Sequence, residues 1–153
     1  MSKKPIIVFE GIEGSGKSHH INKVSQYLDK KKINYIKIRE PGGSLNSEKL
    51  RRLILNKKSN FNIQTDLLLY LAARSENINL IKKFYKKKII LIDRFVDSTI
   101  AYQHYGMGGN LKIINIINRF FLFTTLRKVK LTLMFFNKNL FMTFIIFKST
   151  PIQ

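Results

Sequence analysis

The sequence predicts an α/β fold, in which a parallel sheet carries helices on both faces. Within residues 1–110, short apolar runs alternate with longer segments of helical periodicity, a pattern typical of parallel strands joined by crossover helices. The 153 residues are enough for one domain with a single core. The chain has no cysteine, which excludes a disulfide framework and a thiolate metal site.

The first predicted strand, residues 6–10, is almost continuously apolar, as parallel strands buried on both faces usually are. A glycine-rich turn follows it. We expect a helix from about Ser18 onward, because Ile21, Val24 and Leu28 fall on one helical face.

The remaining predicted elements alternate in the same way. A second strand at 35–39 is followed by a turn at 41–43, where one proline precedes two glycines. A short helix at 47–55 comes next, and a long helix should run from Thr65 to about Lys87. The third strand is predicted at 89–93.

The composition changes in the last third of the chain. All nine acidic residues lie at or before Asp97, whereas eight of the twelve phenylalanines lie in residues 120–147. Residues 131–136 resemble a fourth strand, but 137–153 show no cap, turn or charge pattern. We therefore expect a core domain at 1–136 and an atypical tail at 137–153, so that the C-terminal part of the fold is incomplete. An altered reading frame or a truncated gene end is the favoured explanation.

Neither membrane insertion nor secretion is expected. The apolar stretch at 131–147 is interrupted by residues 137–139, Asn-Lys-Asn, and is shorter than the roughly 20 apolar residues of a spanning helix. The apolar run at 6–9 is too short for a signal peptide. The expected location is the cytoplasm.

The formal net charge of +19 raises the question of nucleic-acid binding, because dense lysine and arginine attract phosphate backbones. A biased composition rich in Lys, Asn and Ile, with most lysines on solvated faces, is the favoured explanation of the charge. No nucleic-acid-binding module is recognisable, so we expect no nucleic-acid partner.

The turn after the first strand matches the pattern G-x-x-x-x-G-K-[ST] over Gly11–Ser18. Its glycines allow successive backbone N–H groups to point at phosphate oxygens, and the next helix adds its positive N-terminal end. The motif follows a strand and opens a helix, which is the context it requires. It predicts a P-loop NTPase fold and an ATP site with Mg²⁺ as cofactor. The expected nucleotide-binding residues are Gly11, Glu13, Gly14, Ser15, Gly16, Lys17 and Ser18.

Two of these residues have defined chemical tasks. Lys17 would reach the β- and γ-phosphates, and the hydroxyl of Ser18 would ligate Mg²⁺. Asp93 ends an apolar strand and is a candidate to hold Mg²⁺ through water. A structural role for Asp93, as a partner of Ser18 or Arg94, is the alternative.

Four motifs in register identify a family. They are Phe9–Ser18 (FEGIEGSGKS), Arg39–Gly43 (REPGG), Ala72–Arg74 (AAR), and Asp93-Arg94 followed by Ser98, Thr99, Ala101, Tyr102 and Gln103. Over residues 5–110 their order and spacing resemble the bacterial thymidylate kinases, which are P-loop nucleoside-monophosphate kinases. The resemblance implies transfer of the γ-phosphoryl group of ATP to thymidine monophosphate with Mg²⁺, and a homodimer as a candidate assembly.

The resemblance also implies residues for the acceptor nucleotide. Arg94 follows a parallel strand, where ligands bind in open α/β sheets, and is expected to contact phosphate as a catalytic residue together with Lys17. Arg51 matches an arginine that clamps the acceptor phosphate, which suits the planar fork of a guanidinium. Tyr70 and Arg74 lie four residues apart and therefore on one face of the same helix. By resemblance, Tyr70 is expected to stack on thymine, and Arg74 is expected to donate to a base oxygen.

Further resemblances complete the expected site. Thr99, Tyr102 and Gln103 match residues that line the base and sugar, and Glu13 matches a carboxylate that accepts a hydrogen bond from the 3′-hydroxyl. On pattern alone, Tyr70 is equally well a core aromatic, whereas Arg51, with Arg52 beside it, is better explained as a solvated helix residue.

The sequence departs from the family in its last part. Members with glycine at the Gly14 position carry catalytic arginines on a lid after the fourth strand. Beyond Phe136 this chain offers only Lys138 and Lys148, and no arginine follows Arg127. Two interpretations therefore remain: a thymidylate kinase, and a truncated, catalytically impaired fragment that binds nucleotides only. Salt-sensitive DNA binding unaffected by ATP would favour a third, a basic nucleic-acid-binding protein.

Overall fold

A computed structural model describes residues 4–126, 129–135 and 142–149 of the chain. The chain divides into two compact units. The sheet unit comprises Met1–Ile38, Lys83–Phe95 and Lys128–Gln153, and the helical unit comprises Arg39–Lys82 and Val96–Arg127. Each unit has its own hydrophobic core.

Three parallel strands form the predicted part of the sheet, β1 (Ile6–Gly11), β2 (Tyr35–Arg39) and β3 (Ile89–Asp93). The strand order is β2-β3-β1-β5-β4, and β1 pairs with β3 in register from Ile6↔Ile90 to Phe9↔Asp93. All three strands lie within one residue of the sequence prediction. The parallel α/β fold is therefore confirmed.

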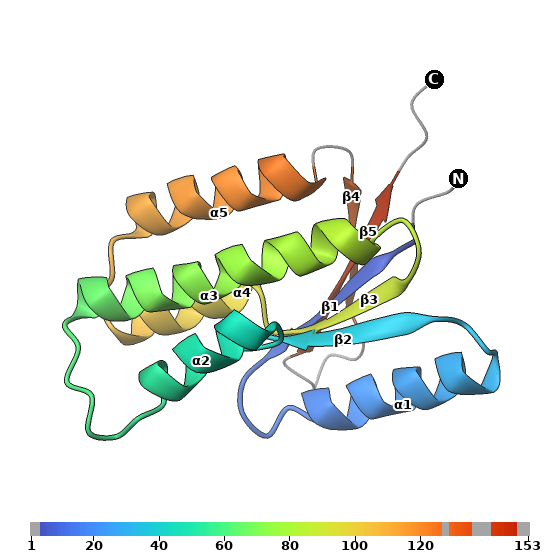
Figure 1. Cartoon of the computed structure of the whole chain (residues 1–153), viewed down its shortest axis with the longest axis horizontal. Helices are drawn as coiled ribbons and strands as arrows, with labels where there is room; N and C mark the ends of the chain where they lie inside the picture. The colour runs from blue at the N-terminus through green and yellow to red at the C-terminus, as the bar shows by residue number, and fades with distance from the viewer. Residues whose placement is uncertain (1–3, 127–128, 136–141, 150–153) are drawn as a thin grey trace. The chain divides into compact units, whose positions relative to one another are not determined.

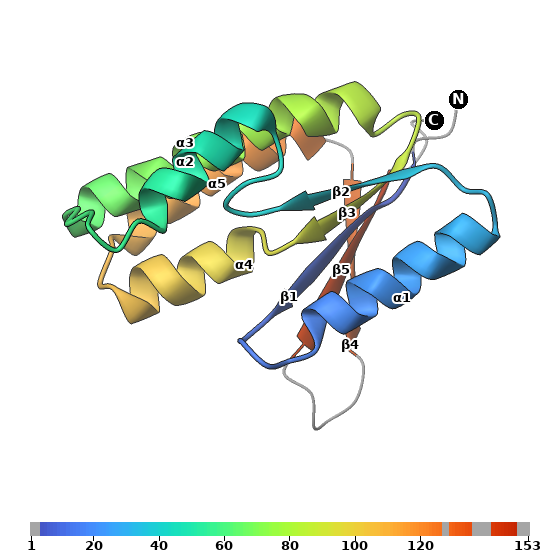
Figure 2. The same ribbon diagram turned by 60° about the horizontal axis from the view of Figure 1, so that its bottom comes forward.

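The first helix, α1 (Lys17–Lys30), packs against this sheet, as Figures 1 and 2 show. Ile21 and Leu28 are buried in one cluster with Phe9 and Leu91, and Val24 packs against that cluster. The helical face predicted from apolar spacing is thus the face that α1 buries, which is how an amphipathic helix gains most of its stability.

Two further strands, β4 (Val129–Phe135) and β5 (Met142–Ser149), form an antiparallel pair, and β5 also pairs antiparallel with β1 from Ile6↔Phe147 to Gly11↔Met142. β4 overlaps the strand predicted at 131–136. β5 was not predicted, because a short apolar run without turn residues does not reveal its secondary structure by periodicity. The rest of the predicted tail, 137–141 and 150–153, lies outside the described residues, and the division at residue 136 stays a prediction.

The helical unit contains two of the predicted helices and three elements that were not predicted. Leu67 and Leu71 of α3 pack with the fully buried Ile114 of α5. The elements of this unit are α2 (Leu45–Ile54), α3 (Ile63–Phe84, whose last two residues belong to the sheet unit), α4 (Val96–Thr99), the π-helix η1 (Ile100–Gly106) and α5 (Leu111–Leu126).

Polar residues fix where the two predicted helices begin. Ser44 caps α2, since its hydroxyl accepts a hydrogen bond from the Ser47 amide. At the start of α3 the Asn62 carboxamide accepts from the amide of Thr65 at 2.8 Å. Both helices therefore begin two residues earlier than predicted, because a side-chain cap lies outside the apolar pattern. Within the described part of the chain, no helix has the length and apolarity needed to cross a bilayer.

Candidate functional site

The predicted phosphate-binding loop lies between β1 and α1, and its backbone is curled as the motif requires. Gly14 and Gly16 have φ angles of 76° and 80°, in the left-handed region that favours glycine. The Ser15 amide donates to the carbonyl of Ile12 at 3.3 Å. The helix starts at Lys17, so its free N–H groups lie at the end of the loop.

Lys17 is 92% buried and its ammonium group binds the loop itself. Its Nζ donates to the carbonyls of Gly11 at 2.8 Å and Ile12 at 2.7 Å, with the Ser15 hydroxyl at 3.4 Å. Burial lowers the pKa of Lys17, and the positive charge of Arg94 lowers it further. The ammonium is thus partly desolvated and close to the backbone that would surround a phosphate.

The guanidinium of Arg94 is a second positively charged group that binds the same loop. Its Nη1 donates to the Gly11 carbonyl at 3.2 Å, and its backbone N–H donates to the carbonyl of Phe9 at 3.0 Å. Arg94 has a φ of 67°, a conformation that costs a non-glycine residue about 1–2 kcal/mol. The segment after it is held by Glu10, whose buried carboxylate accepts from the Phe95 amide at 2.8 Å.

The structure also tests whether the residues near β3 fit Mg²⁺. The Oδ1 atom of Asp93 is buried and has no hydrogen-bond partner among the described residues, as expected of an acceptor for a metal-bound water. Ser18 is exposed in the first turn of α1. In the described ranges no three His, Asp or Glu residues gather to hold a metal. This donor set fits Mg²⁺, which keeps several waters and phosphate ligands.

In the helical unit, Arg74 is the centre of a buried polar cluster. Its guanidinium is almost fully buried, and Nε donates to Oε2 of Glu40 at 2.8 Å. Nη1 donates to Asn118 at 2.6 Å, and Nη2 donates to Thr99 at 2.7 Å and forms an ion pair with Glu40 at 2.7 Å. All three nitrogens are therefore engaged, and the guanidinium plane is fixed.

The partners of Arg74 leave further buried polar atoms. Burial raises the pKa of Glu40, and the charge of Arg74 opposes this shift. The atoms Oε1 of Glu40, Nδ2 of Asn118 and Nε2 of Gln103 are buried without a hydrogen-bond partner among the described residues. Since buried polar groups are nearly always bonded in native proteins, these atoms are available to a ligand or an ordered water.

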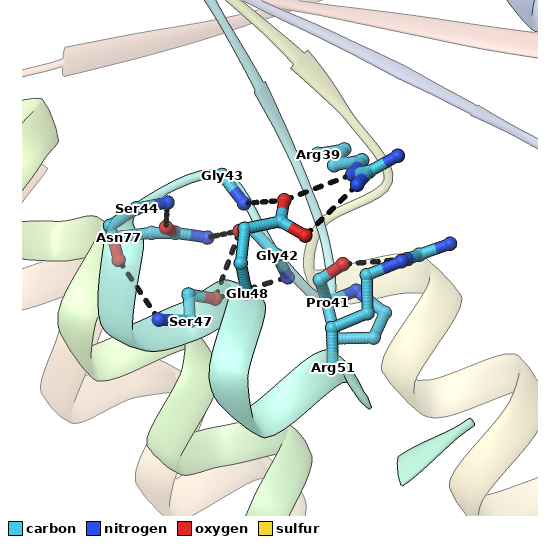
Figure 3. A network of polar contacts seen from close by, with 9 residues as sticks. All are labelled: Arg39, Pro41, Gly42, Gly43, Ser44, Ser47, Glu48, Arg51 and Asn77. Carbon is cyan, nitrogen blue, oxygen red and sulfur yellow. Dashed lines mark hydrogen bonds and ion pairs between the residues drawn. The ribbon is translucent and has the colours of Figure 1, made fainter. Parts of the chain in front are cut away.

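Arg51 lies on α2 beside the loop that follows β2. Its Nη1 donates to the Pro41 carbonyl at 2.7 Å, so its guanidinium is held against this loop (Figure 3). One turn earlier on α2, Glu48 accepts two hydrogen bonds from Arg39, at 3.1 and 2.9 Å, and one from the Gly43 amide at 2.8 Å. These bonds lower the pKa of Glu48 to about 2.

The structure brings only some of the predicted acceptor residues into contact. Arg74 and Thr99 share a hydrogen bond. Gln103 is buried in η1, whereas Tyr102 beside it is 41% exposed. Tyr70 is half-buried on α3. Their assignment to base and sugar, and that of Glu13, which is exposed in the P-loop, stays a prediction.

Sequence reasoning missed three residues that hold the predicted ones. Glu10 anchors the segment after Arg94, and Glu40 and Asn118 bind Arg74. Asn118 carried no distinct signal, because the polar residues Asn115 and Arg119 lie beside it on α5. Glu40 lies within the REPGG motif, but the sequence does not indicate which side chain it binds.

Comparisons with known proteins agree with the fold and the motifs. The sequence model of the thymidylate kinase family matches residues 9–133. A thymidylate kinase from Kosmotoga olearia is 40% identical over 116 residues, which are 74% of this chain and 56% of the relative. Another from Nostoc punctiforme is 44% identical over 117 residues, with the same coverages.

A solved structure gives the same result in three dimensions. The crystal structure of thymidylate kinase from Ehrlichia chaffeensis matches with a TM-score of 0.65 at 37% identity, covering 78% of this chain and 66% of that chain. The chain spans only 56% of the length of the two sequence relatives. The resemblance expected from the four motifs is confirmed, and this chain belongs to the thymidylate kinase family.

Proposed function

We propose that the chain is a phosphotransferase that converts thymidine monophosphate to the diphosphate, with ATP and Mg²⁺. The observation that carries the proposal is the convergence of two cations on the P-loop. Lys17 and Arg94 both donate to the carbonyl of Gly11, at 2.8 and 3.2 Å. Phosphoryl transfer needs little more from a protein than alignment and neutralisation of charge on the phosphate oxygens.

In this proposal the loop Gly11–Ser18 binds the phosphates of ATP. The ammonium of Lys17 and the guanidinium of Arg94 would exchange the Gly11 carbonyl for phosphate oxygens, a stronger charge-assisted interaction. Ser18 and Asp93 would hold Mg²⁺, which supplies charge neutralisation between the phosphates. The partial burial of Lys17 favours this exchange, because a desolvated cation gains more from an anion.

The acceptor nucleotide is assigned to the remaining predicted residues. Arg51 would bind the phosphate of thymidine monophosphate, Tyr70 would stack on the base, and Glu13 would accept from the 3′-hydroxyl. Thr99, Tyr102 and Gln103 would line the base and sugar. The buried unpaired atoms of Glu40, Gln103 and Asn118 supply one acceptor and two donors for such a ligand or for water.

The position of Arg74 sharpens this assignment. Its guanidinium is engaged by three side chains, so it would meet a base oxygen as a preset donor rather than by reorienting. A fixed donor loses little conformational freedom on binding, which favours specificity.

A second candidate function is nucleotide binding without turnover. It is favoured by the stretch after Phe136, where the resemblance implies lid arginines and the given residues offer Lys138 and Lys148 instead. In this case ATP and thymidine monophosphate bind, but the charge of the transferring group is incompletely neutralised.

Release of ADP from ATP and Mg²⁺ in the presence of thymidine monophosphate tests the proposal. Lys17→Ala serves as the blank, and uridine and deoxyguanosine monophosphates test the acceptor. Turnover above the blank that is selective for thymidine monophosphate supports the kinase. No turnover, with ATP still raising the melting temperature, supports nucleotide binding alone.

We further propose a cytoplasmic protein without a membrane or nucleic-acid partner that forms a homodimer. The support is family membership and the composition bias. Sedimentation at micromolar concentration tests the dimer. Salt-dependent retention of DNA that ATP does not change would contradict the part of this proposal that concerns nucleic acid.

A further inference from the structure

Asn77 is a fully buried polar residue on α3 whose carboxamide binds backbone groups of another segment and also lies within hydrogen-bonding reach of the buried Glu40 carboxylate. Its Oδ1 accepts from the Ser44 amide at 3.1 Å, and its Nδ2 donates to the Gly42 carbonyl at 2.6 Å. Both ends of the amide thus bind the loop that follows β2 (Figure 3). A buried asparagine used in this way fixes a backbone conformation rather than filling space.

The same loop is held from α2 by Ser47, which is also fully buried. The Ser47 hydroxyl accepts from the Gly42 amide at 3.0 Å and donates to the Gly42 carbonyl at 2.9 Å. The Gly42 carbonyl therefore receives two hydrogen bonds, one from each helix. We call Asn77 and Ser47 the loop clamp.

The clamped loop in turn supports Arg51. Gly42 has a φ of 117°, and a Cβ atom at this position would lie 3.1 Å from Cδ of Arg51. The stem of Arg51 therefore packs on the loop, and its Nη1 binds the Pro41 carbonyl at 2.7 Å. If the loop moves, both the stem and the guanidinium of Arg51 lose their support.

We infer that Asn77 is a positioning residue for the acceptor phosphate. It acts through the Pro41–Gly43 loop on Arg51 and thereby raises the affinity for the 5′-phosphate of a nucleoside monophosphate. This inference rests on the proposed role of Arg51. It adds a residue that contacts no nucleotide but determines how well the arginine is oriented, and orientation is what a bidentate phosphate contact requires.

Substitution by aspartate tests this role, and it also places a carboxylate beside the buried carboxylate of Glu40. Asn77→Asp keeps the shape and the acceptor for the Ser44 amide but loses the donor to Gly42, and sets a carboxylate against that carbonyl. Asn79→Asp is the matched control, since Asn79 is exposed on the same helix. Arg51→Lys provides the partner variant, because lysine keeps the charge but lacks the planar fork.

The experiment is a double-mutant cycle on the full chain. Calorimetric titration with thymidine monophosphate, and separately with ATP, compares the wild type with Asn77→Asp, Arg51→Lys, the double variant and Asn79→Asp. We expect Asn77→Asp to weaken thymidine monophosphate binding about tenfold, the scale of a lost buried hydrogen bond. In the Arg51→Lys background the same change should cost less than about twofold, because coupled residues are not additive. ATP affinity and the Asn79→Asp control should not change.

Two results would overturn the inference: unchanged affinity in Asn77→Asp, or an equal loss in both backgrounds, which indicates general softening of the fold. If Asn77→Asp does not fold, Ser47→Ala tests the clamp from the α2 side with the same expectation. A wild-type chain that binds no thymidine monophosphate rejects the proposed function and the inference together. A wild type that binds, with no coupling to Asn77, rejects the inference alone.

Discussion

The two glycine-rich loops of this chain are held in opposite ways. The P-loop after β1 is held by charged side chains, since Lys17 and Arg94 donate to its carbonyls. The Pro41–Gly43 loop after β2 is held by the buried, neutral side chains of Asn77 and Ser47. A cation that binds a backbone carbonyl can exchange this carbonyl for a phosphate, which it binds more strongly. The neutral side chains of Asn77 and Ser47 have no such stronger partner in a phosphate.

This difference indicates a division of work. In the first loop the binding groups are themselves the groups that hold the apo conformation, so ligand binding must rearrange them. In the second loop the proposed binding group, Arg51, is separate from the groups that fix the backbone. Preorganisation of this second kind lowers the entropy lost on binding.

The largest expected change in stability concerns the ion pair between Arg74 and Glu40, the residue that precedes the Pro41–Gly43 loop. Replacing Arg74 by methionine leaves the buried carboxylate of Glu40 without its ion pair, which should cost about 3–5 kcal/mol of unfolding free energy. Arg39→Met removes an ion pair whose arginine side chain is 55% exposed, and should cost less than about 1 kcal/mol. Denaturant unfolding of both variants measures the difference. Equal losses of unfolding free energy in the two variants would show that burial does not determine how much these ion pairs contribute to stability.

A smaller difference in stability is expected between alanine substitutions of one glycine in each loop. A Cβ at position 42 would lie 2.6 Å from Oε1 of Glu48, so Gly42→Ala combines backbone strain with a clash and should cost about 2–4 kcal/mol. Gly14 has a positive φ but nothing within 4 Å, so Gly14→Ala should cost only about 1 kcal/mol. Thermal unfolding of the two variants gives the comparison. A larger loss of stability for Gly14→Ala would mean that the P-loop, and not the Pro41–Gly43 loop, tolerates substitution less.

The strain at Arg94 allows stability to be separated from binding. Glycine adopts a φ near 67° without penalty, whereas alanine keeps the strain. Arg94→Gly should therefore be about 1 kcal/mol more stable than Arg94→Ala, while both lose turnover equally. Urea unfolding combined with the ADP assay measures the two properties. Equal stability of the variants would mean that the chain relaxes at this position.

The smallest effect concerns pH. The pKa of Glu48 falls from its ordinary value of 4.5 to about 2 in the folded chain. The contribution of the ionised Glu48 side chain to the free energy of unfolding is therefore fully present above pH 4.5 and is lost as the pH falls through 2. Because the Glu48 and Arg39 side chains are 33% and 55% exposed, the contribution should stay below about 1 kcal/mol. The stability difference between wild type and Glu48→Gln should shrink between pH 4.5 and 2. A difference that does not change over this range would contradict the assignment.

The sequence predicted the parts of the fold that periodicity and glycine encode. The three parallel strands, α1 and the P-loop follow from apolar spacing and from glycines whose backbone angles other residues avoid. The positions of the P-loop after β1 and of Arg94 after β3 also follow from the topology, because parallel strands end at the same edge.

Other parts left no comparable signal. Asn77 looks like any polar helix residue, since its partners are backbone groups 33 and 35 positions away. Asn118 acts through Arg74, 44 positions distant. The strand β5 offers neither alternation nor turn residues, so its place beside β1 depends on tertiary pairing alone.

That pairing has a consequence for synthesis on the ribosome. β1 is made before one of its two hydrogen-bonding partners, β5, which comes from residues 142–149. Until those residues are synthesised, the strand that leads into the P-loop has one open edge, and an open apolar edge is a template for pairing with other chains. The yield of folded protein should therefore depend on elongation rate and on chaperones that cover nascent strands.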